Sequence, residues 1–350
     1  MVCVLLKGVS VMKKALALLL LTVMAFMYIP ALGEGAYSGQ TVWYTRMAAV
    51  NGEVYCLGEP APLWVNSAVY RVNPEGKTAV ARRWSGWECL YAAGDRLLLV
   101  YGVLNIGEVL GSHPSSVREA QLLDPATGRS MVLGRFSTTE KGTNRIFAAA
   151  GQVYRTVRDG DRWELQRLAD LNDRRSWMTV LAWTGNQPDV QMTFCVIGSR
   201  GRTVLYEYAS GKEYDVTALM RQGLIRNWTG VVERGVLYQA QDGLLSDWLT
   251  ALDLTTGEKS KLVRLVRDRL NGFLLAEEQA ILLYSEQGEN YRADVYDRST
   301  WTLTGSVAFT EYPEDVLLLG DRLFVSCPYA EAGAQVIDLT TGEQASMDLD

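Results

Sequence analysis

Short apolar segments alternate with polar turns along most of the chain. Continuously apolar segments occupy Leu97–Tyr101, Ile281–Tyr284 and Leu323–Ser326. An apolar run of this length between turn residues indicates a β-strand that is covered on both faces. Other segments, such as Lys77–Arg83 and Glu258–Leu265, mix charged with apolar residues, as in a strand with one face in solvent. Helical periodicity over ten or more residues is missing from each unit, which argues against a helical solenoid.

Two stretches near the C-terminus are almost the same: LDLTTGEK, Leu252–Lys259, and IDLTTGEQ, Ile337–Gln344. A related stretch, Val295–Gly305, lies midway between them, so the underlying period is close to half of their separation. In D-x-x-T-G the Asp accepts hydrogen bonds from the backbone N–H groups that follow, and the Gly adopts the positive φ that closes a tight hairpin. Weaker copies, which bring the number to seven, centre on Gly76, Gly128, Asn172 and Gly211.

A second series of turns has the same period and the same number of members. Each is followed by an apolar strand, and the seven begin at Asn51, Gly94, Gly151, Asn186, Arg234, Glu278 and Gly320. Two unrelated turn types that share a period of 40 to 50 residues predict seven units of four antiparallel strands. Such units close into a ring, so we predict an all-β fold, a seven-bladed β-propeller of four-stranded antiparallel blades.

Three of the turn stretches resemble the repeats of PQQ-like and YncE-like bacterial propellers: Leu122–Arg129, Ala251–Glu258 and Val336–Glu343. The resemblance covers most of residues 40 to 350 and implies the architecture, whereas such repeats serve many unrelated functions. The Trp that usually follows the T-G turn is absent from the clear copies. An adjacent Cys pair, as in quinoprotein dehydrogenases, is also absent. PQQ is therefore not implied, and we expect no cofactor.

The first 33 residues have the pattern of a secretory signal peptide. Lys13 and Lys14 precede the apolar run Ala15–Met27, and Ala31-Leu32-Gly33 matches a small-x-small cleavage site. Residues 34–350 then form a single propeller domain, and the protein is secreted or extracytoplasmic at the cell surface. The alternative is an uncleaved membrane anchor, although the run of about 15 to 18 residues is shorter than the roughly 20 that span a bilayer.

Composition narrows the possible partners. With 34 Lys and Arg against 40 Asp and Glu and no basic cluster, we expect no nucleic-acid partner. Four cysteines follow the signal segment, each within an apolar stretch: Cys56, Cys89, Cys195 and Cys327. Free Cys in such surroundings behaves as a small buried apolar residue, which is the interpretation we favour. Two disulfides in an oxidising compartment remain the alternative.

Signals for catalysis are few. The sequence contains no G-x-S-x-G, H-E-x-x-H or Walker motif, and its only histidine, His113, lies in the long insertion Gly102–Ser116. We interpret His113 as an exposed loop residue and Asp159–Asp161 as a hairpin tip, and we predict no metal site. The alternative function is an extracellular carbohydrate-active enzyme, a hydrolase or lyase that uses carboxylates at the channel mouth.

Large aromatic residues recur where the innermost strands are expected to begin. They are Trp43 with Tyr44, Trp87, Trp177, Trp228 and Tyr312, and loops expected on the same face add Trp64, Trp248 and Tyr329. Their rings could gather near the mouth of the central channel, where Trp and Tyr suit stacking on sugars or anchoring of a peptide. Ordinary packing between blades is the alternative. The sequence thus favours a binding or scaffold protein that recognises a glycan, peptide or protein partner.

Overall fold

The computed structural model describes eleven segments of the chain. They are residues 46–58, 67–83, 87–102, 117–137, 142–199, 201–241, 246–266, 270–285, 290–309, 313–327 and 333–347. At six of these positions only the backbone is described: Ser67, Arg83, Trp87, Glu88, Cys327 and Met347. All of these residues belong to the larger of two compact units of the chain, Tyr37–Val103 with Ser116–Asp350. The expected signal segment, residues 1–33, lies outside the described residues.

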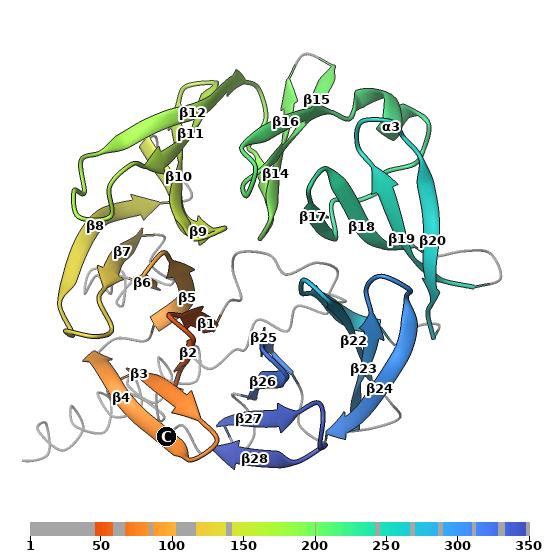
Figure 1. Ribbon diagram of the computed structural model, residues 1–350. Helices are drawn as coiled ribbons and strands as arrows, with labels where there is room; N and C mark the ends of the chain where they lie inside the picture. Colours follow the sequence, from red (N-terminus) through yellow and green to blue (C-terminus); the bar gives the residue numbers. More distant parts are fainter. Residues whose placement is uncertain are drawn as a thin grey trace, which may run out of the picture. The chain divides into compact units, whose positions relative to one another are not determined.

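Seven four-stranded antiparallel sheets stand in a ring (Figure 1). Each blade consists of four consecutive strands, with the first nearest the centre and the fourth at the perimeter. Blades 1 to 3 comprise β1 (Met47–Val50), β2 (Glu53–Leu57), β3 (Ser67–Asn73) and β4 (Gly76–Arg83); β5 (Trp87–Ala93), β6 (Arg96–Gly102), β7 (Val117–Leu123) and β8 (Ser130–Ser137); and β9 (Gly142–Ala149), β10 (Gln152–Asp159), β11 (Arg162–Leu168) and β12 (Trp177–Thr184).

Blades 4 to 7 follow the same order. They comprise β13 (Asp189–Val190), β14 (Phe194–Ser199), β15 (Arg202–Glu207) and β16 (Lys212–Asp215); β17 (Val231–Glu233), β18 (Val236–Gln241), β19 (Trp248–Asp253) and β20 (Lys259–Arg264); β21 (Leu270–Leu275), β22 (Gln279–Ser285), β23 (Tyr291–Asp297) and β24 (Thr302–Phe309); and β25 (Asp315–Leu319), β26 (Arg322–Cys327), β27 (Gly333–Asp338) and β28 (Gln344–Met347). The predicted all-β, seven-bladed propeller is confirmed.

The D-x-x-T-G turns join the third and fourth strands of a blade. In blade 5, Oδ1 of Asp253 accepts hydrogen bonds from the backbone N–H groups of Thr255 (2.8 Å) and Thr256 (2.7 Å), and Gly257 has φ +76°. These are the predicted contacts of the motif. In blade 6, Trp301 (φ +55°) takes the position of the glycine, while Gly305 lies inside β24.

The second series of turns joins the first and second strands. At Asn51-Gly52, both residues have positive φ, +53° and +77°. Arg234-Gly235 shows the same combination, +51° and +79°. Two successive positive φ values are what a type I′ hairpin requires, and this turn matches the twist of the flanking strands. The glycines of this series are therefore needed for chain reversal.

The core lies between neighbouring blades. In β6 the residues Leu97–Tyr101 are all buried, which confirms that this predicted strand is covered on both faces. Cys56, Cys89 and Cys195 form no disulfide and are buried, and burial raises the pKa of Cys56 and of Cys195 to about 12. The alternative of two disulfides is therefore wrong. The side chain of Cys327 lies outside the described residues.

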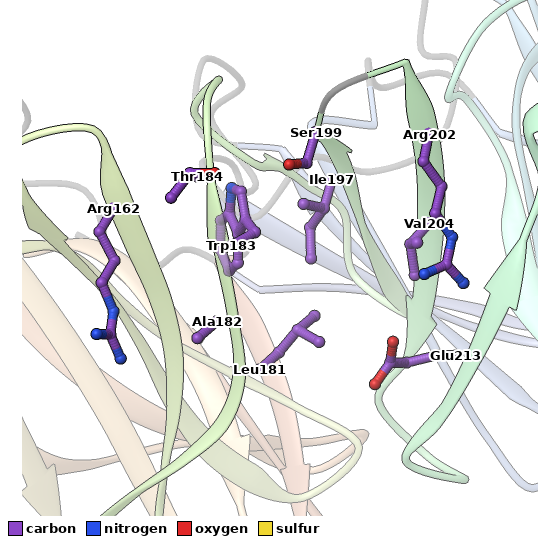
Figure 2. Close-up of a pocket in the computed structure, with 10 residues that line it drawn as sticks. All are labelled: Arg162, Leu181, Ala182, Trp183, Thr184, Ile197, Ser199, Arg202, Val204 and Glu213. Atoms are coloured by element: carbon purple, nitrogen blue, oxygen red, sulfur yellow. The ribbon is translucent and has the colours of Figure 1, made fainter.

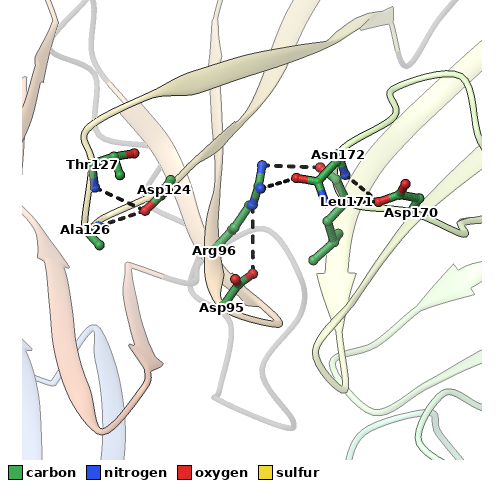
Figure 3. A network of polar contacts seen from close by, with 8 residues as sticks. All are labelled: Asp95, Arg96, Asp124, Ala126, Thr127, Asp170, Leu171 and Asn172. Atoms are coloured by element: carbon green, nitrogen blue, oxygen red, sulfur yellow. Dashed lines mark hydrogen bonds and ion pairs between the residues drawn. The ribbon is translucent and has the colours of Figure 1, made fainter.

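Polar contacts also link adjacent blades. Arg96 of blade 2 donates to the backbone carbonyl of Leu171 (3.4 Å) and to Oδ1 of Asn172, both in the turn before β12 of blade 3 (Figure 3). Its Nε lies 3.8 Å from Oδ1 of Asp95. This turn, like that of blade 6, lacks the glycine of the motif, and its longer loop reaches the neighbouring blade.

Among the described strands, none is exchanged between blades 7 and 1, because each of these blades consists of consecutive strands. An apolar cluster spans the junction and includes Met47 and Cys56 from blade 1 with Phe324 from blade 7. Beside it, Oδ2 of Asp315 accepts hydrogen bonds from the backbone N–H groups of Arg46 (2.7 Å) and Met47 (2.9 Å). Within the described residues, closure rests on side-chain packing, the buried carboxyl group of Asp315 and the ion pair between Arg46 and Glu314.

Helix is scarce in the described part of the chain. The helix α3 (Thr217–Arg221) has five residues and follows β16. Among the described residues, none of the helices has the length and apolar character needed to cross a bilayer.

Candidate binding site

A groove of about 710 Å³ separates the outer parts of blades 3 and 4 (Figure 2). It is lined by β11 and β12 on one side and by β14, β15 and β16 on the other, through Arg162, Leu181, Ala182, Trp183, Thr184, Ile197, Ser199, Arg202, Val204 and Glu213. The short outer strand of blade 4 accounts for the hollow. β16 has four residues where β12 has eight, so part of β12 has no outer strand facing it.

The floor of the groove is apolar and rigid. Trp183 is only 8% exposed, and its ring stacks on Trp163 with centroids 6.4 Å apart and an interplanar angle of 8°. Nε1 of Trp183 donates to the backbone carbonyl of Asn186 (3.0 Å), and Nε1 of Trp163 donates to that of Gly185 (3.2 Å). Two stacked indoles that are each hydrogen-bonded hold this wall in one conformation.

The rim of the groove carries charges of both signs. Arg162 forms an ion pair with Glu164 (2.9 Å), and Arg202 forms one with Asp215 (2.7 Å). Hydrogen bonds from Thr217 and Arg202 lower the pKa of Asp215 to about 2. Glu213 lies exposed on the same side as Arg202. An apolar floor with polar groups at its edge is suited to binding, because the floor supplies contact area and the rim supplies orientation.

Two predicted aromatic residues lie at the same end of the blades as the upper part of the groove. Trp228 lies in the connection from blade 4 to blade 5, shortly before β17. Trp248 begins β19, directly after the connection between the second and third strands of blade 5. Both kinds of connection lie at the same end of the blades. Trp248 donates to Oγ of Ser246 (2.9 Å), with Nζ of Lys261 5.0 Å from its ring centroid. Trp228 packs against the apolar cluster between blades 4 and 5. Both rings are half-buried.

The placement of Trp177 on an innermost strand is wrong. Trp177 begins β12, the outermost strand of blade 3, at the opposite end of the blades from Trp228. Its ring lies 4.2 Å from the guanidinium carbon of Arg155, which fits packing against a cation. The physical cause of the error is that β12 contains no charged residue, so its composition resembles that of a buried inner strand.

The other predicted ligand-binding residues are only partly placed. Trp87 begins β5, the first strand of blade 2, as predicted, and its side chain lies outside the described residues. Several further positions are outside the described residues altogether: Trp43, Tyr44, Trp64, His113, Tyr312 and Tyr329. Asp159–Asp161 forms the predicted hairpin tip, where Asp159 pairs with Arg162 across the turn between β10 and β11.

Candidates for catalysis are limited within the described residues. No cluster of three or more His, Cys, Asp or Glu side chains in this part of the chain could hold a metal ion. Burial raises the pKa of Asp315 to about 7, in the range of a general acid. The side chain is nevertheless 3% exposed and bonded to backbone N–H groups at the ring junction. A general acid must touch its substrate, so this carboxyl group serves the fold instead.

Sequence reasoning did not identify the groove. None of its lining residues was among the predicted site residues, because a cleft between two blades depends on the relative length of strands that are far apart in sequence. One local signal existed: the stretch WMTVLAWT, Trp177–Thr184, is uncharged although it follows a polar turn of the outer series. An apolar outer strand is unusual in this chain and marks the wall of the groove.

Comparisons with known proteins identify the fold. No protein-family model matches the sequence, and no curated protein matches it. The propeller domain of the Trilobed protease from Pyrococcus furiosus, described as having an open velcro topology, superposes with a TM-score of 0.52 and 11% identity over 87% of this chain and 94% of that domain. A prolyl endopeptidase gives 0.54 and 10% identity over 92% of this chain.

The chain spans 52% of that prolyl endopeptidase, about half its length. At these levels of identity the likeness concerns the fold alone. The resemblance of the repeats to PQQ-like and YncE-like propellers therefore holds for the architecture, a seven-bladed propeller.

Proposed function

We propose that this protein is a secreted or cell-surface β-propeller that acts as a binding or scaffold module for a glycan, peptide or protein partner. The observation that carries the proposal is the groove between blades 3 and 4, with an apolar floor and a rim of mixed charge. Rigid rings of blades with variable connections are well suited to present such a surface. The export signal expected in residues 1–33 supports an extracytoplasmic location.

The chemistry of the groove favours a peptide segment over a sugar. Stacking on a sugar ring needs an accessible aromatic face, whereas Trp183 is buried and already stacked on Trp163. Leu181 and Val204 are half-buried and offer aliphatic surface to an apolar side chain. Charged groups of both signs at the rim match the mixed charges of a polypeptide. We therefore assign the groove to a peptide or protein partner.

The test is binding of the purified protein to printed arrays of peptides and of glycans. Val204→Arg and Glu213→Arg place a bulky cation in the groove from blade 4 and should weaken peptide binding at least about tenfold. Val132→Arg is the control for a surface arginine, since Val132 is exposed on β8, the outer strand of blade 2, and does not line the groove. Peptide binding that survives both groove variants would exclude this site.

The half-buried rings of blade 5 supply the glycan alternative. If a sugar is the partner, Trp228→Ala or Trp248→Ala should abolish glycan binding while peptide binding is unchanged. Thermal melting of each variant separates the two roles of these rings. A ring that only packs between blades should lower the melting temperature by several degrees without a selective effect on either array.

Export has its own test. Expression of the full chain in a bacterial host, followed by cell fractionation and N-terminal sequencing, should yield a mature protein outside the cytoplasm that begins near residue 34. A protein retained with its first residues intact in the membrane fraction would show instead that the apolar segment is an anchor. A cytoplasmic protein would contradict both locations.

A further inference from the structure

The outer edge of blade 3 is unusual among the seven blades. β12 forms the perimeter of the blade (Figure 1), and its eight residues, Trp177–Thr184, include no charged residue and no proline. Six of the eight are apolar, and Met178 is 47% exposed. A long uncharged strand at a sheet edge presents a row of backbone N–H and C=O groups to any other strand.

Most other outer strands carry the charges that prevent such contacts. β4 and β20 each contain three basic residues, β16 has three charged residues among four, and β8 has Arg135. β28 is uncharged and has only four residues. Natural sheets blunt their edges with charges and short strands, so β12 departs from the pattern of its own ring.

β24 is the other long uncharged edge, and three features set it apart. Half of its residues are apolar, and Gly305 interrupts its centre. Nε2 of Gln344 in blade 7 also donates to the backbone carbonyl of Ala308 (2.7 Å), which occupies an acceptor of this strand. For β12, no side chain among the described residues bonds to a backbone atom of the strand. The edge of β12 is therefore more open to another strand than the edge of β24.

A β-bulge limits how β12 can pair. The register between β11 and β12 shifts at Val180, and similar shifts occur between the third and fourth strands of five other blades. A bulge bends the edge locally and discourages one continuous ladder. On either side of it the register is regular, at Trp177–Thr179 and Leu181–Thr184. Pairing with another strand would therefore use these two short segments.

We propose that a second copy of this chain binds at this edge, with β12 antiparallel to β12. Antiparallel pairing of one strand with itself generates a two-fold axis, so the same surface is used twice and the assembly closes as a dimer. The absence of charge is what makes β12 compatible with itself, because a basic strand such as β4 would bring like charges face to face. The position of β12 at the perimeter lets two rings meet edge to edge (Figure 1).

The proposal concerns the backbone edge of β12. Residues 181–184 of this strand also line the groove, so dimerisation is measured on the protein without added peptide. The contact comprises at most seven residues on each side, Trp177–Thr179 and Leu181–Thr184, which is small for a stable interface. We therefore expect a reversible dimer whose population increases with protein concentration.

The test is sedimentation velocity or light scattering of the purified protein over a wide range of concentration. The expected result is a mass that rises toward twice that of one chain. Met178→Lys combined with Ala182→Lys puts a cation on each regular segment and should abolish the dimer. Leu303→Lys is the matched control on β24, because Leu303 is 54% exposed on the other long uncharged edge, and it should leave the dimer unchanged.

Three outcomes would overturn the proposal: a wild-type protein that stays monomeric at every concentration, a dimer that survives the double substitution, or a dimer that only Leu303→Lys removes. Circular dichroism and thermal melting of each variant show whether it remains folded. Both lysines replace exposed side chains, so loss of the fold is not expected. A monomer that binds peptides through the groove would leave the binding proposal intact while it refutes this one.

Discussion

Asp315 in blade 7 holds the backbone of Met47 in blade 1, 268 residues earlier in the chain, through a hydrogen bond of 2.9 Å to the N–H group. The same oxygen accepts a second bond from Arg46 (2.7 Å), and Arg46 pairs with Glu314 (3.1 Å). The carboxyl group thus joins the first strands of the last and first blades. Such contacts matter here because no backbone ladder between described strands crosses the junction.

Asp315→Ala should destabilise the protein by about 2 to 4 kcal/mol, because it leaves the backbone N–H groups of Arg46, Met47 and Val316 without their acceptor. Asp338→Ala is the matched control, since Asp338 accepts two backbone N–H bonds but lies in an exposed turn. Water can replace that acceptor, so the cost there should be about 1 kcal/mol. Chemical unfolding gives both values, and equal costs would show that the junction does not depend on Asp315.

The ring junction should also make stability depend on pH. Burial raises the pKa of Asp315 to about 7, against an ordinary value of 3.8, although the backbone bonds oppose this shift. Between about pH 4 and pH 7 the folded protein keeps this proton while the unfolded chain has lost it, so the free energy of unfolding falls as pH rises.

Asp315→Asn has no proton to lose and provides the reference for this effect. The stability of the wild type relative to Asp315→Asn should therefore decrease from pH 4 to pH 7, on the order of a few kcal/mol in total. Urea unfolding at several pH values measures this difference and cancels the contributions of other carboxylates. A difference that is constant over this range would contradict the raised pKa.

Position 230 requires glycine for two reasons: its backbone has a positive φ, and neighbouring atoms leave no space for a side chain. Its φ is +144°, and a Cβ at this position would lie 2.3 Å from the backbone carbonyl oxygen of Tyr238. Gly201 (φ +80°) has the same need for positive φ with open space around it. Gly201→Ala should cost about 1 kcal/mol, whereas Gly230→Ala should cost roughly 1 to 3 kcal/mol more. Equal costs in thermal or urea unfolding would mean that the backbone around Tyr238 relaxes freely.

Trp301 is a bulky residue with positive φ, where blades 2, 4, 5 and 7 have glycine. Its ring lies 6.1 Å from that of Tyr238, so Trp301→Gly both relieves the backbone and removes a contact. Comparison with Trp301→Ala isolates the contribution of the backbone conformation to stability, because both variants lose the ring. We expect Trp301→Gly to be more stable than Trp301→Ala by about 1 kcal/mol. The reverse order in urea unfolding would show that the chain adjusts φ once the ring is gone.

Local chemistry along the sequence determined the blades. Asp253 and Gly257 specify a turn through groups that are at most four residues apart, and the apolar run Leu97–Tyr101 specifies a buried strand through its own composition. Because such signals recur at a regular interval, the number of blades and the order of their strands could be predicted. The burial of Cys56, Cys89 and Cys195 followed from the same local patterns.

Tertiary structure alone decided features that depend on residues far apart in the chain. The groove exists because β16 is shorter than β12, and no local pattern compares two outer strands of adjacent blades. Trp177 was assigned to the wrong strand because an apolar outer strand has the composition of an inner one. The ring junction joins Asp315 to Met47, and only the closed ring brings that carboxyl group to its partners.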